Sequence, residues 1–322
     1  MSEQLPGLHH MTAICGDAQR NVDFYVGVLG LRLVKKTVNF DDPGTYHLYY
    51  GDWQGNPGSI LTFFAWAQAQ RGRRGLGQVT ATGLTVPEGA LDYWKERLTK
   101  SGVSLGTVET RFGQSVLAFE DHDGLPLELI TRPEAAMETA DLWVGGPVPA
   151  QYAIRRMEGV TLTVAQREPT EKTLFALGFT LIGEEEGRLR YSAGQGESST
   201  LADVLVSPDA PRGSLGVGIV HHVAWRTPSD ETELDWRRQI LEQGRSVSPV
   251  MDRDYFHSIY FHEPGGVLFE IATNPPGFTT DEPLESLGTR LCVPAWLEER
   301  RALLEQTLTP LRLPAPVVAE AP

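Results

Sequence analysis

The 322 residues include 28 basic and 42 acidic side chains, for a net charge of −14, and 41% of them are hydrophobic. A surface with this excess of negative charge repels nucleic acid and anionic membranes, so neither is expected as a partner. The chain shows no apolar stretch of about 20 residues and no signal-peptide pattern, and its two cysteines, Cys15 and Cys292, offer neither a disulfide framework nor a cysteine-rich zinc site. We therefore expect a cytoplasmic protein.

Residues 7–66 read as one structural unit. The unit begins with the strand-like run "HHMTAIC", and a helical pattern follows, for which Asp17 is a plausible N-cap. Three β-rich runs come next, separated by glycine, proline and aspartate turns: "RLVKKTVNF", "TYHLYYGD" and "GSILTFFAW". This order predicts a βαβββ unit.

The same order of elements recurs at about 76–133, 152–208 and 218–275. In the last copy, "HHVAWRT" begins the unit and a helix starts at about Asp230. The first and last copies share a register, because 13 residues separate His10 from Asp23 and also His222 from Asp235. A βαβββ unit cannot bury its sheet face alone, so four units predict two pairs and an α+β fold.

Two domains are expected from this repeat, residues 1–133 and 152–275, each with two units. Between them, 134–151 has no clear period and reads as a linker. Residues 276–322 fall outside the repeat, and there "PAWLEERRALLEQTL" predicts a helix that Pro294 begins, as a lid, clamp or interface element. Assembly into a homo-oligomer is left open.

Histidine occupies the same position on the first strand of the first and last units, as His10 and His222. Near the end of these units, superposing "NPGSILTFF" on "EPGGVLFEI" sets Phe63 opposite Glu270. Two histidines and one carboxylate on rigid strands form the facial triad of non-haem Fe(II) sites, which leaves positions open for substrate and dioxygen. Zinc hydrolysis with the same ligands remains an alternative, because the ligand types alone do not choose the metal.

The two middle units lack such a set. Their first-strand and last-strand positions are, within the error of the alignment, Val79 or Thr80, Glu158 or Gly159, Glu128, and an apolar residue near Val204. Without a histidine partner, Glu128 reads as a hydrogen-bonded or exposed carboxylate. Three other histidines, His47, His122 and His262, lie in polar or turn-rich stretches, and no functional role is expected for them.

The first histidine of each pair, His9 or His221, poses a separate question. Successive residues of a strand point to opposite faces, so both members of a pair cannot simply bind one ion. These two side chains line the pocket if the strand twists or bulges there; otherwise they pack across strands. Spacing alone does not decide between the two.

The sequence resembles the vicinal oxygen chelate superfamily (glyoxalases, extradiol dioxygenases and bleomycin-resistance proteins), and more narrowly its hydroquinone-type ring-cleaving dioxygenases. The blocks that carry the resemblance are "GLHHMTAI", "NVDFYVGVLGLRLVKKTVNFDDPGTYHLYYGD", "HHVAW", "RDYFHSIYFHEPGGVLFEIATNPPGFTTDEP" and "VPAWLEERR". The resemblance implies two vicinal-oxygen-chelate domains, with the first and fourth units building one site. It also implies Fe(II), with Mn or Zn as possible substitutes, held by His10, His222 and Glu270.

The resemblance further implies a substrate pocket made of His9, Thr12, His221, Arg253 and Tyr260. The implied substrates are dioxygen and a small hydroquinone-type or catechol-like aromatic, whose ring is opened. In that reaction Arg253 would stabilise an oxyanion, and His221, His9 or Tyr260 would move protons.

Two alternatives share the fold. A glyoxalase-like isomerase needs a fourth protein ligand, and Phe63 at the matching position cannot bind a metal. A non-catalytic resistance protein that sequesters a small molecule leaves the His–His–Glu set unexplained.

Overall fold

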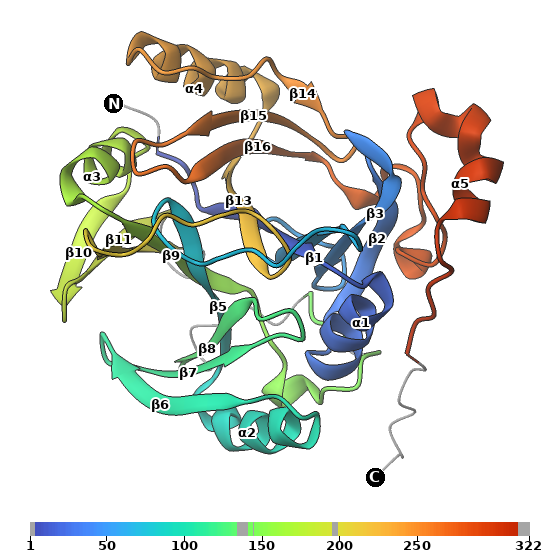
Figure 1. Ribbon diagram of the computed structural model, residues 1–322, viewed down its shortest axis with the longest axis horizontal. Helices are drawn as coiled ribbons and strands as arrows, with labels where there is room; N and C mark the ends of the chain where they lie inside the picture. Colours follow the sequence, from blue (N-terminus) through green and yellow to red (C-terminus); the bar gives the residue numbers. More distant parts are fainter. Residues whose placement is uncertain (1–3, 134–140, 144, 195–198, 315–322) are drawn as a thin grey trace.

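The computed structural model describes residues 4–133, 141–143, 145–194 and 199–314 (Figure 1). Within these ranges the strands form two curled sheets of eight strands each. The predicted α+β fold of four βαβββ units, followed by a C-terminal helix, is confirmed. The predicted linker at 134–151 lies partly outside the described residues.

The first sheet is built from the first and fourth units. The first unit supplies β1 (Leu8–Cys15), β2 (Arg32–Asn39), β3 (Asp42–Gly51) and β4 (Ile60–Ala65). The fourth supplies β13 (Ile219–Thr227), β14 (Met251–Asp252), β15 (Phe256–His262) and β16 (Leu268–Pro276). Because the strand order is β14-β15-β16-β13-β1-β4-β3-β2, the two histidine-bearing strands β1 and β13 are neighbours, and they pair antiparallel.

The second sheet is built from the second and third units in the same way, with the order β10-β11-β12-β9-β5-β8-β7-β6. The second unit supplies β5 (Gln78–Pro87), β6 (Leu105–Arg111), β7 (Gln114–Glu120) and β8 (Pro126–Arg132). The third supplies β9 (Met157–Val164), β10 (Thr180–Glu185), β11 (Arg188–Ala193) and β12 (Thr200–Val206). Each sheet therefore takes strands from both sides of the linker, and the domain boundary at 134–151 stays a prediction.

One helix follows the first strand of each unit: α1 (Ala18–Val22), α2 (Leu91–Lys100), α3 (Arg167–Ala176) and α4 (Asp230–Glu242). The predicted cap of α1 is confirmed, because the Asp17 side chain accepts a hydrogen bond from the Arg20 amide. Beyond Val22 this helix continues as a π-helical turn, Asp23–Val28. No helix among the described residues is long and apolar enough to span a membrane.

The C-terminal helix begins later than predicted. Pro294 precedes a 3₁₀ segment, Ala295–Arg300, and α5 (Arg301–Thr307) follows it. Figure 1 shows α5 beside β2 and β3, at the edge of the first sheet.

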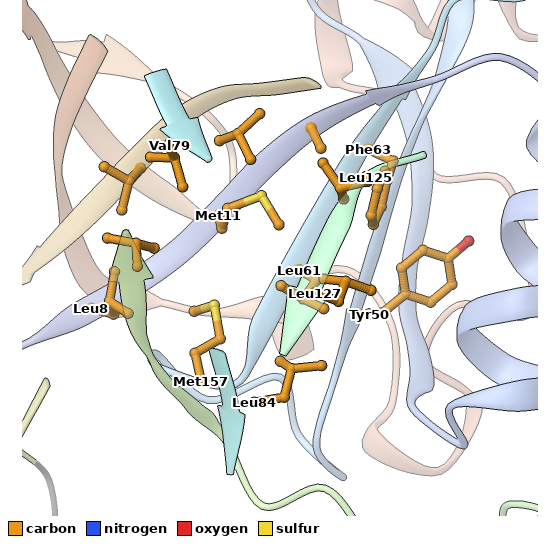
Figure 2. Close-up of a cluster of buried hydrophobic side chains, with 14 of the residues drawn as sticks. Leu8, Met11, Tyr50, Leu61, Phe63, Val79, Leu84, Leu125, Leu127 and Met157 are labelled. Carbon is orange, nitrogen blue, oxygen red and sulfur yellow. The ribbon is translucent and has the colours of Figure 1, made fainter. Parts of the chain in front are cut away.

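A hydrophobic core fills the space between the two sheets (Figure 2). Met11 of β1, Val79 of β5, Leu127 of β8 and Met157 of β9 meet there, all at most 4% exposed. Burying each such side chain contributes about 1.5–3 kcal/mol. Since side chains alternate along a strand, a residue next to Met11 is turned to the other face of the sheet, where the candidate site lies.

Candidate metal centre

A β-bulge in β1 brings the two histidines of the first pair to the same side. Leu8 pairs with Trp225 and His10 with Ala224, so His9 is an extra residue on β1. A bulge re-aims side chains and relaxes the strict alternation of a strand. The imidazoles of His9 and His10 can therefore touch, with their Nδ1 atoms 2.9 Å apart.

A second bulge lies on the neighbouring strand. Thr12 pairs with His222, and Ala13 with Val220, so His221 is the extra residue on β13. The Nδ1 atoms of His221 and His222 are 2.8 Å apart. The two adjacent-histidine pairs thus adopt the same arrangement, one on each of two antiparallel strands.

The ligand atoms of His10, His222 and Glu270 converge at the centre of the sheet. The Nε2 atoms of His10 and His222 lie 3.4 Å apart, and Glu270 Oε2 lies 3.3 Å from the former and 2.9 Å from the latter. All three side chains are buried. Protein ligands of transition metals lie about 2.0–2.2 Å from the ion, so neighbouring ligand atoms around it are separated by about 3 Å.

The state of Glu270 also fits a bound cation. Ser258 Oγ donates a hydrogen bond to Oε1, whereas the buried Oε2 faces the Nε2 atoms of His10 and His222. Burial raises the pKa of this carboxyl, but His10 and His222 outweigh that effect and hold the pKa well below its usual value. A bare carboxylate oxygen facing two imidazole nitrogens is a donor set for a divalent transition metal.

A cavity of about 320 Å³ opens beside this cluster. Of the predicted pocket residues, it brings together Thr12, His221, Arg253 and Tyr260, and both ligand histidines reach it. His9 is not among its lining residues. The buried His9 ring lies behind His10, and its Nε2 is 3.1 Å from the Thr273 carbonyl oxygen.

The two first histidines are neutral. Burial, followed by the neighbouring His10, lowers the pKa of His9 to about 3. Burial and the adjacent His222 likewise lower the pKa of His221 to about 3. Each ring therefore carries a single N–H.

Arg253 and Tyr260 form a polar pair in the cavity wall. Arg253 Nε donates to the Tyr260 hydroxyl at 3.2 Å, and its Nη1 lies 3.2 Å from an Asp41 carboxylate oxygen. Burial and the Glu270 charge raise the pKa of Tyr260, although Arg253 opposes them, so Tyr260 remains a phenol that can donate a hydrogen bond. Burial alone would lower the pKa of Arg253, but Tyr260 and Asp41 raise it, and the guanidinium stays charged.

His47 lines the cavity, although no functional role was predicted for it from the sequence. On β3, its Nδ1 is 3.0 Å from the Tyr49 hydroxyl and its Nε2 is 2.7 Å from Thr62 Oγ1, which in turn contacts Thr12 Oγ1 at 3.0 Å. Burial lowers the pKa of His47 well below its ordinary value, so the ring is neutral. The alternation of strand side chains in "TYHLYY" places His47 and Tyr49 on one face of β3, and this pattern could have indicated that both line the same cavity.

The predicted equivalence of Phe63 and Glu270 is wrong by one residue. Glu270 pairs with Ala224, two residues after His222, and Thr62 pairs with Thr12, two residues after His10. Thr62 therefore occupies the position equivalent to Glu270. Counted from the aligned Pro-Gly pairs, Glu270 comes six residues after Pro264, whereas Thr62 comes five after Pro57. A slip of one residue changes the face to which a strand side chain points. Phe63 itself lies in the core between the sheets (Figure 2).

The second sheet places other residues at the equivalent positions. Its two bulges lie at Thr80 and Glu158, so the counterparts of His222 and His10 are Ala81 and Gly159. The alternatives Val79, Thr80 and Glu158 for these positions are thereby excluded. Two residues farther along, Gly83 pairs with Glu128, and Thr161 pairs with Asp203, which replaces the expected apolar residue near Val204.

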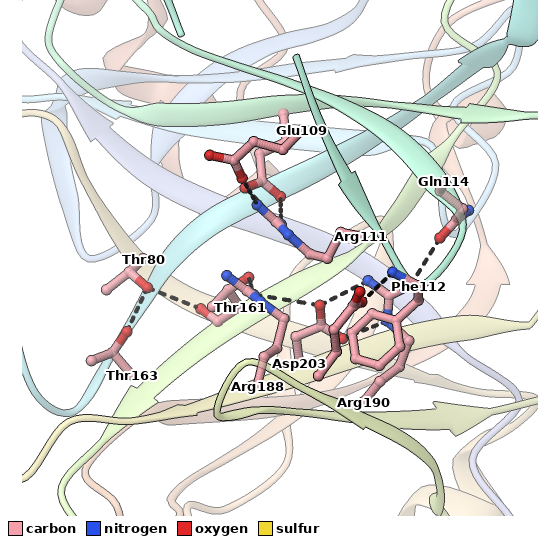
Figure 3. A network of polar contacts seen from close by, with 12 residues as sticks. Thr80, Glu109, Arg111, Phe112, Gln114, Thr161, Thr163, Arg188, Arg190 and Asp203 are labelled. Atoms are coloured by element: carbon pink, nitrogen blue, oxygen red, sulfur yellow. Dashed lines mark hydrogen bonds and ion pairs between the residues drawn. The ribbon is translucent and has the colours of Figure 1, made fainter. Parts of the chain in front are cut away.

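Arginines neutralise Glu128 and Asp203, the carboxylates at these positions of the second sheet, and Figure 3 shows Asp203 with Arg188 and Arg190. Arg111 Nη1 lies 3.0 Å from Glu128, and Arg190 Nε lies 2.8 Å from Asp203, with Arg188 3.4 Å from the same carboxylate. These groups form a network of ion pairs, which confirms that Glu128 is hydrogen-bonded.

Comparisons with known proteins agree with this arrangement. Residues 7–129 and 175–271 match the family model of the Glyoxalase/Bleomycin resistance protein/Dioxygenase superfamily. The chain is 46% identical to "Putative ring-cleaving dioxygenase MhqO" of Bacillus subtilis, over 97% of this chain and 99% of that one. It is 36% identical to "Chlorohydroquinone/hydroquinone 1,2-dioxygenase" of Sphingobium indicum, over 96% and 97% of the two chains.

Solved structures show the same fold. A crystal structure of a putative dioxygenase from Bacillus subtilis superposes with a TM-score of 0.92 at 45% identity and covers 97% of this chain and 99% of its own. Maize glyoxalase I superposes with a TM-score of 0.61 at 17% identity, covering 83% of this chain and 92% of its own, and is similar in fold alone. The matched family model covers most of the repeat, and the chain belongs to the Glyoxalase/Bleomycin resistance protein/Dioxygenase superfamily.

Proposed function

We propose that the protein is a metal-dependent dioxygenase that opens the ring of a hydroquinone-type aromatic. The observation that carries the proposal is the buried cluster of His10, His222 and Glu270 beside a cavity that both histidines line. Relatives at 36–46% identity over nearly the whole chain, named as ring-cleaving or hydroquinone dioxygenases, support it.

The cluster is proposed to hold Fe(II). Two neutral imidazoles and one carboxylate suit this ion, and a set of three protein ligands leaves coordination positions open. When bound, iron supplies a Lewis acid for the ring hydroxyl and a one-electron path between the aromatic and dioxygen. Mn or Zn in the same ligands is the alternative that metal analysis decides.

The cavity suits a small flat substrate. At about 320 Å³ it lies at the lower end of the range for small-molecule pockets. Aromatic side chains line it, among them Tyr49, Phe64 and Phe256, and rings of this kind pack favourably against an aromatic substrate. Its polar groups gather near the ligand cluster, so the hydroxyl-bearing end of a hydroquinone is expected there.

Arg253 and Tyr260 are proposed to orient the substrate and stabilise its negative charge. The guanidinium is held in place by Asp41 and by the Tyr260 hydroxyl, so it needs little reorganisation when an oxyanion forms. The Tyr260 phenol can donate a hydrogen bond to a substrate oxygen. Both side chains face the cavity from the fourth unit, beside Glu270.

His47 is proposed as the proton acceptor for a substrate hydroxyl, in place of His9. The ring is neutral, reaches the cavity and is held by Tyr49 and Thr62 on its two nitrogens. Because Thr62 Oγ1 bonds to both His47 Nε2 and Thr12 Oγ1, the imidazole can take a proton relayed through these hydroxyls and return it by the same route. His221, which also lines the cavity, is the second candidate for proton transfer.

The isomerase alternative loses support from the position of Thr62. This side chain occupies the place equivalent to Glu270, and its hydroxyl is already hydrogen-bonded to Thr12 and His47. That position therefore does not supply a carboxylate as a fourth protein ligand.

Oxygen uptake tests the proposal. Fe(II)-loaded protein should consume dioxygen with hydroquinone or a substituted hydroquinone and yield a ring-opened product, whereas Glu270→Gln should consume none. Absence of uptake with a panel of hydroquinones and catechol, together with anaerobic isomerisation of a thiol hemiacetal, would show that the activity belongs to the isomerase class.

A further inference from the structure

Each adjacent-histidine pair shares one hydrogen atom between two Nδ1 nitrogens. The Nδ1–Nδ1 distances are 2.9 Å for His9 and His10 and 2.8 Å for His221 and His222. Two ring nitrogens at this distance form a hydrogen bond only if one carries a hydrogen atom and the other presents its lone pair. In each pair, therefore, one imidazole is the donor and the other the acceptor.

On β1, a backbone carbonyl decides the direction. His9 Nε2 lies 3.1 Å from the carbonyl oxygen of Thr273, which can only accept a hydrogen bond. His9 is buried and packs against the ring of Phe256, surroundings that favour a neutral imidazole. Its single N–H is then on Nε2, and its Nδ1 presents a lone pair. The hydrogen atom between the two rings belongs to His10 Nδ1. As a result His10 Nε2 is unprotonated, and it is this atom that faces His222 and Glu270.

We propose that His9 is a positioning residue that fixes His10 in the Nδ1–H tautomer, the form that presents Nε2 to a metal ion. The inference rests on the proposed metal site. Metal-bound histidines generally donate their other N–H to an acceptor that holds the ring and its tautomer. Here that acceptor is a second imidazole, and the β-bulge at His9 makes the contact possible, because a regular strand would turn the two rings to opposite faces.

The pair on β13 is less constrained. Within the described residues, no backbone carbonyl hydrogen-bonds to His221 Nε2, and the ring is partly exposed and lines the cavity. Moreover, His222 Nε2 lies 2.9 Å from Glu270 Oε2 and can carry its hydrogen atom there in the metal-free protein. His10 is thus set for binding in advance, whereas His222 takes the Nδ1–H tautomer, with His221 as acceptor, when the metal binds.

Nitrogen-15 NMR of histidine-labelled protein reads the tautomers directly. In the metal-free protein we expect His9 as the Nε2–H form and His10 as the Nδ1–H form; after Zn(II) loading, His222 should also be the Nδ1–H form. Metal-free His10 in the Nε2–H form would overturn the proposal. Because this measurement uses the wild-type chain, it does not depend on whether a variant folds.

Zn(II) affinity, measured by competition with a chelator, gives the second readout. His9→Leu removes the acceptor and should weaken binding about 10–100-fold, whereas His9→Asn, whose amide oxygen can stand near the Nδ1 position, should restore most of the affinity. Thr80→Val, at the equivalent of His221 on the second sheet, is the matched control and should leave affinity unchanged.

Equal affinities for wild type and His9→Leu would also refute the role of His9. Neither measurement involves dioxygen or an aromatic substrate, so the test of the tautomer is independent of the test of oxygen uptake. A protein that binds Zn(II) with the expected tautomers and consumes no dioxygen would contradict the proposed function and leave this inference intact.

Discussion

At the centre of the first sheet, β1 and β13 each carry one extra residue, and at the centre of the second sheet β5 and β9 do the same. In each unit, the residue that follows the bulge marks the position of His10 or His222. Two residues after that position, the first strand pairs with a polar residue of the unit's last strand. In the first sheet these are Thr62 and Glu270, and in the second they are Glu128 and Asp203. The backbone plan is thus common to both sheets, and the side chains alone differ.

The difference lies in what faces the carboxylates. An arginine keeps its proton under all ordinary conditions, so the pairs of Arg111 with Glu128 and Arg190 with Asp203 are complete without any other ion. An imidazole can lose its proton and present a lone pair, so His10 and His222 leave Glu270 in need of a cation. One centre is therefore a finished ion-pair network, and the other is a site for a metal.

Steric room reinforces this division. At Gly159, the counterpart of His10, an added Cβ would lie 2.2 Å from the carbonyl oxygen of Leu201. No side chain fits there without a shift of the backbone, so the second sheet cannot be converted into a metal site by placing a histidine at this position.

The largest effect is expected for the carboxylate that separates the two centres. Glu270→Gln should lose the metal and all ring-opening activity, because a neutral amide cannot compensate the charge of the ion. Its counterpart Glu128→Gln should retain the metal. Metal analysis of the purified variants checks this, and normal metal content in Glu270→Gln would remove that residue from the site.

A second large effect is expected for Tyr260, which faces Glu270 across β15 and β16, where the second sheet has Ala118 opposite Glu128. Tyr260→Phe should keep its metal and lower turnover about 10²-fold or more, because the hydroxyl that bonds to Arg253 and reaches the cavity is lost. Tyr46→Phe, whose hydroxyl donates to the Thr309 carbonyl away from the cavity, is the control. Unchanged steady-state turnover in Tyr260→Phe would exclude it from the reaction.

The second centre should respond in stability instead of activity. Asp203→Asn leaves the buried Arg190 without its charge partner, and breaking such a pair lowers the free energy of unfolding by about 3–5 kcal/mol. The metal content of the folded variant should stay normal. Denaturant unfolding and metal analysis together check this, and loss of metal without loss of stability would contradict the division between the centres.

A smaller, pH-dependent effect is expected behind the first sheet. Glu233 of α4 is buried, and both its carboxylate oxygens lack hydrogen-bond partners among the described residues. Glu233 comes three residues before the buried Trp236, and in α2 the residue three before the buried Trp94 is Leu91. Burial, with help from Asp230, raises the pKa of Glu233 from 4.5 to about 7. The folded state therefore holds a proton that the unfolded chain releases, and the contribution of this group to stability falls as pH rises from about 4.5 to 7.

Glu233→Leu, which copies α2, should accordingly raise the free energy of unfolding by about 1–2 kcal/mol at pH 8 and by much less near pH 4.5. Glu231→Leu, at an exposed position of the same helix, is the control. Urea unfolding at the two pH values measures the difference, and an equal gain at both would show that packing, not charge, is responsible.

Sequence periodicity was sufficient for the four units and for the register that selects His10 and His222, because both depend on local spacing. Sequence periodicity failed to identify Thr62 and Asp203. One residue more or less in a surface turn does not change the hydrophobic pattern, but it reverses the face of every strand residue that follows. The pairing of the first unit with the fourth came from family resemblance and not from spacing, because many edge-to-edge arrangements of four units bury the same residues.

The roles of His9 and His47 illustrate two further limits. The bulge at His9 depends on the register between β1 and β13, which are more than two hundred residues apart in the chain. His47 gains its importance because β3 lies beside β4 and brings the ring over Thr62, a contact set by the curl of the whole sheet. Histidine in a polar stretch carries no local sign of such surroundings.

The sheet order has a consequence for how the protein is made. His10 and His222 are 212 residues apart, and β1 lies between β4 and β13, so its second neighbouring strand belongs to the last repeat to be synthesised. Until that repeat leaves the ribosome, β1 has an unpaired edge and the metal ligands are incomplete, whereas the second and third units can already pair with each other. Acquisition of the metal is thereby tied to completion of the repeat, and a chain that stops before the fourth unit cannot hold the ion.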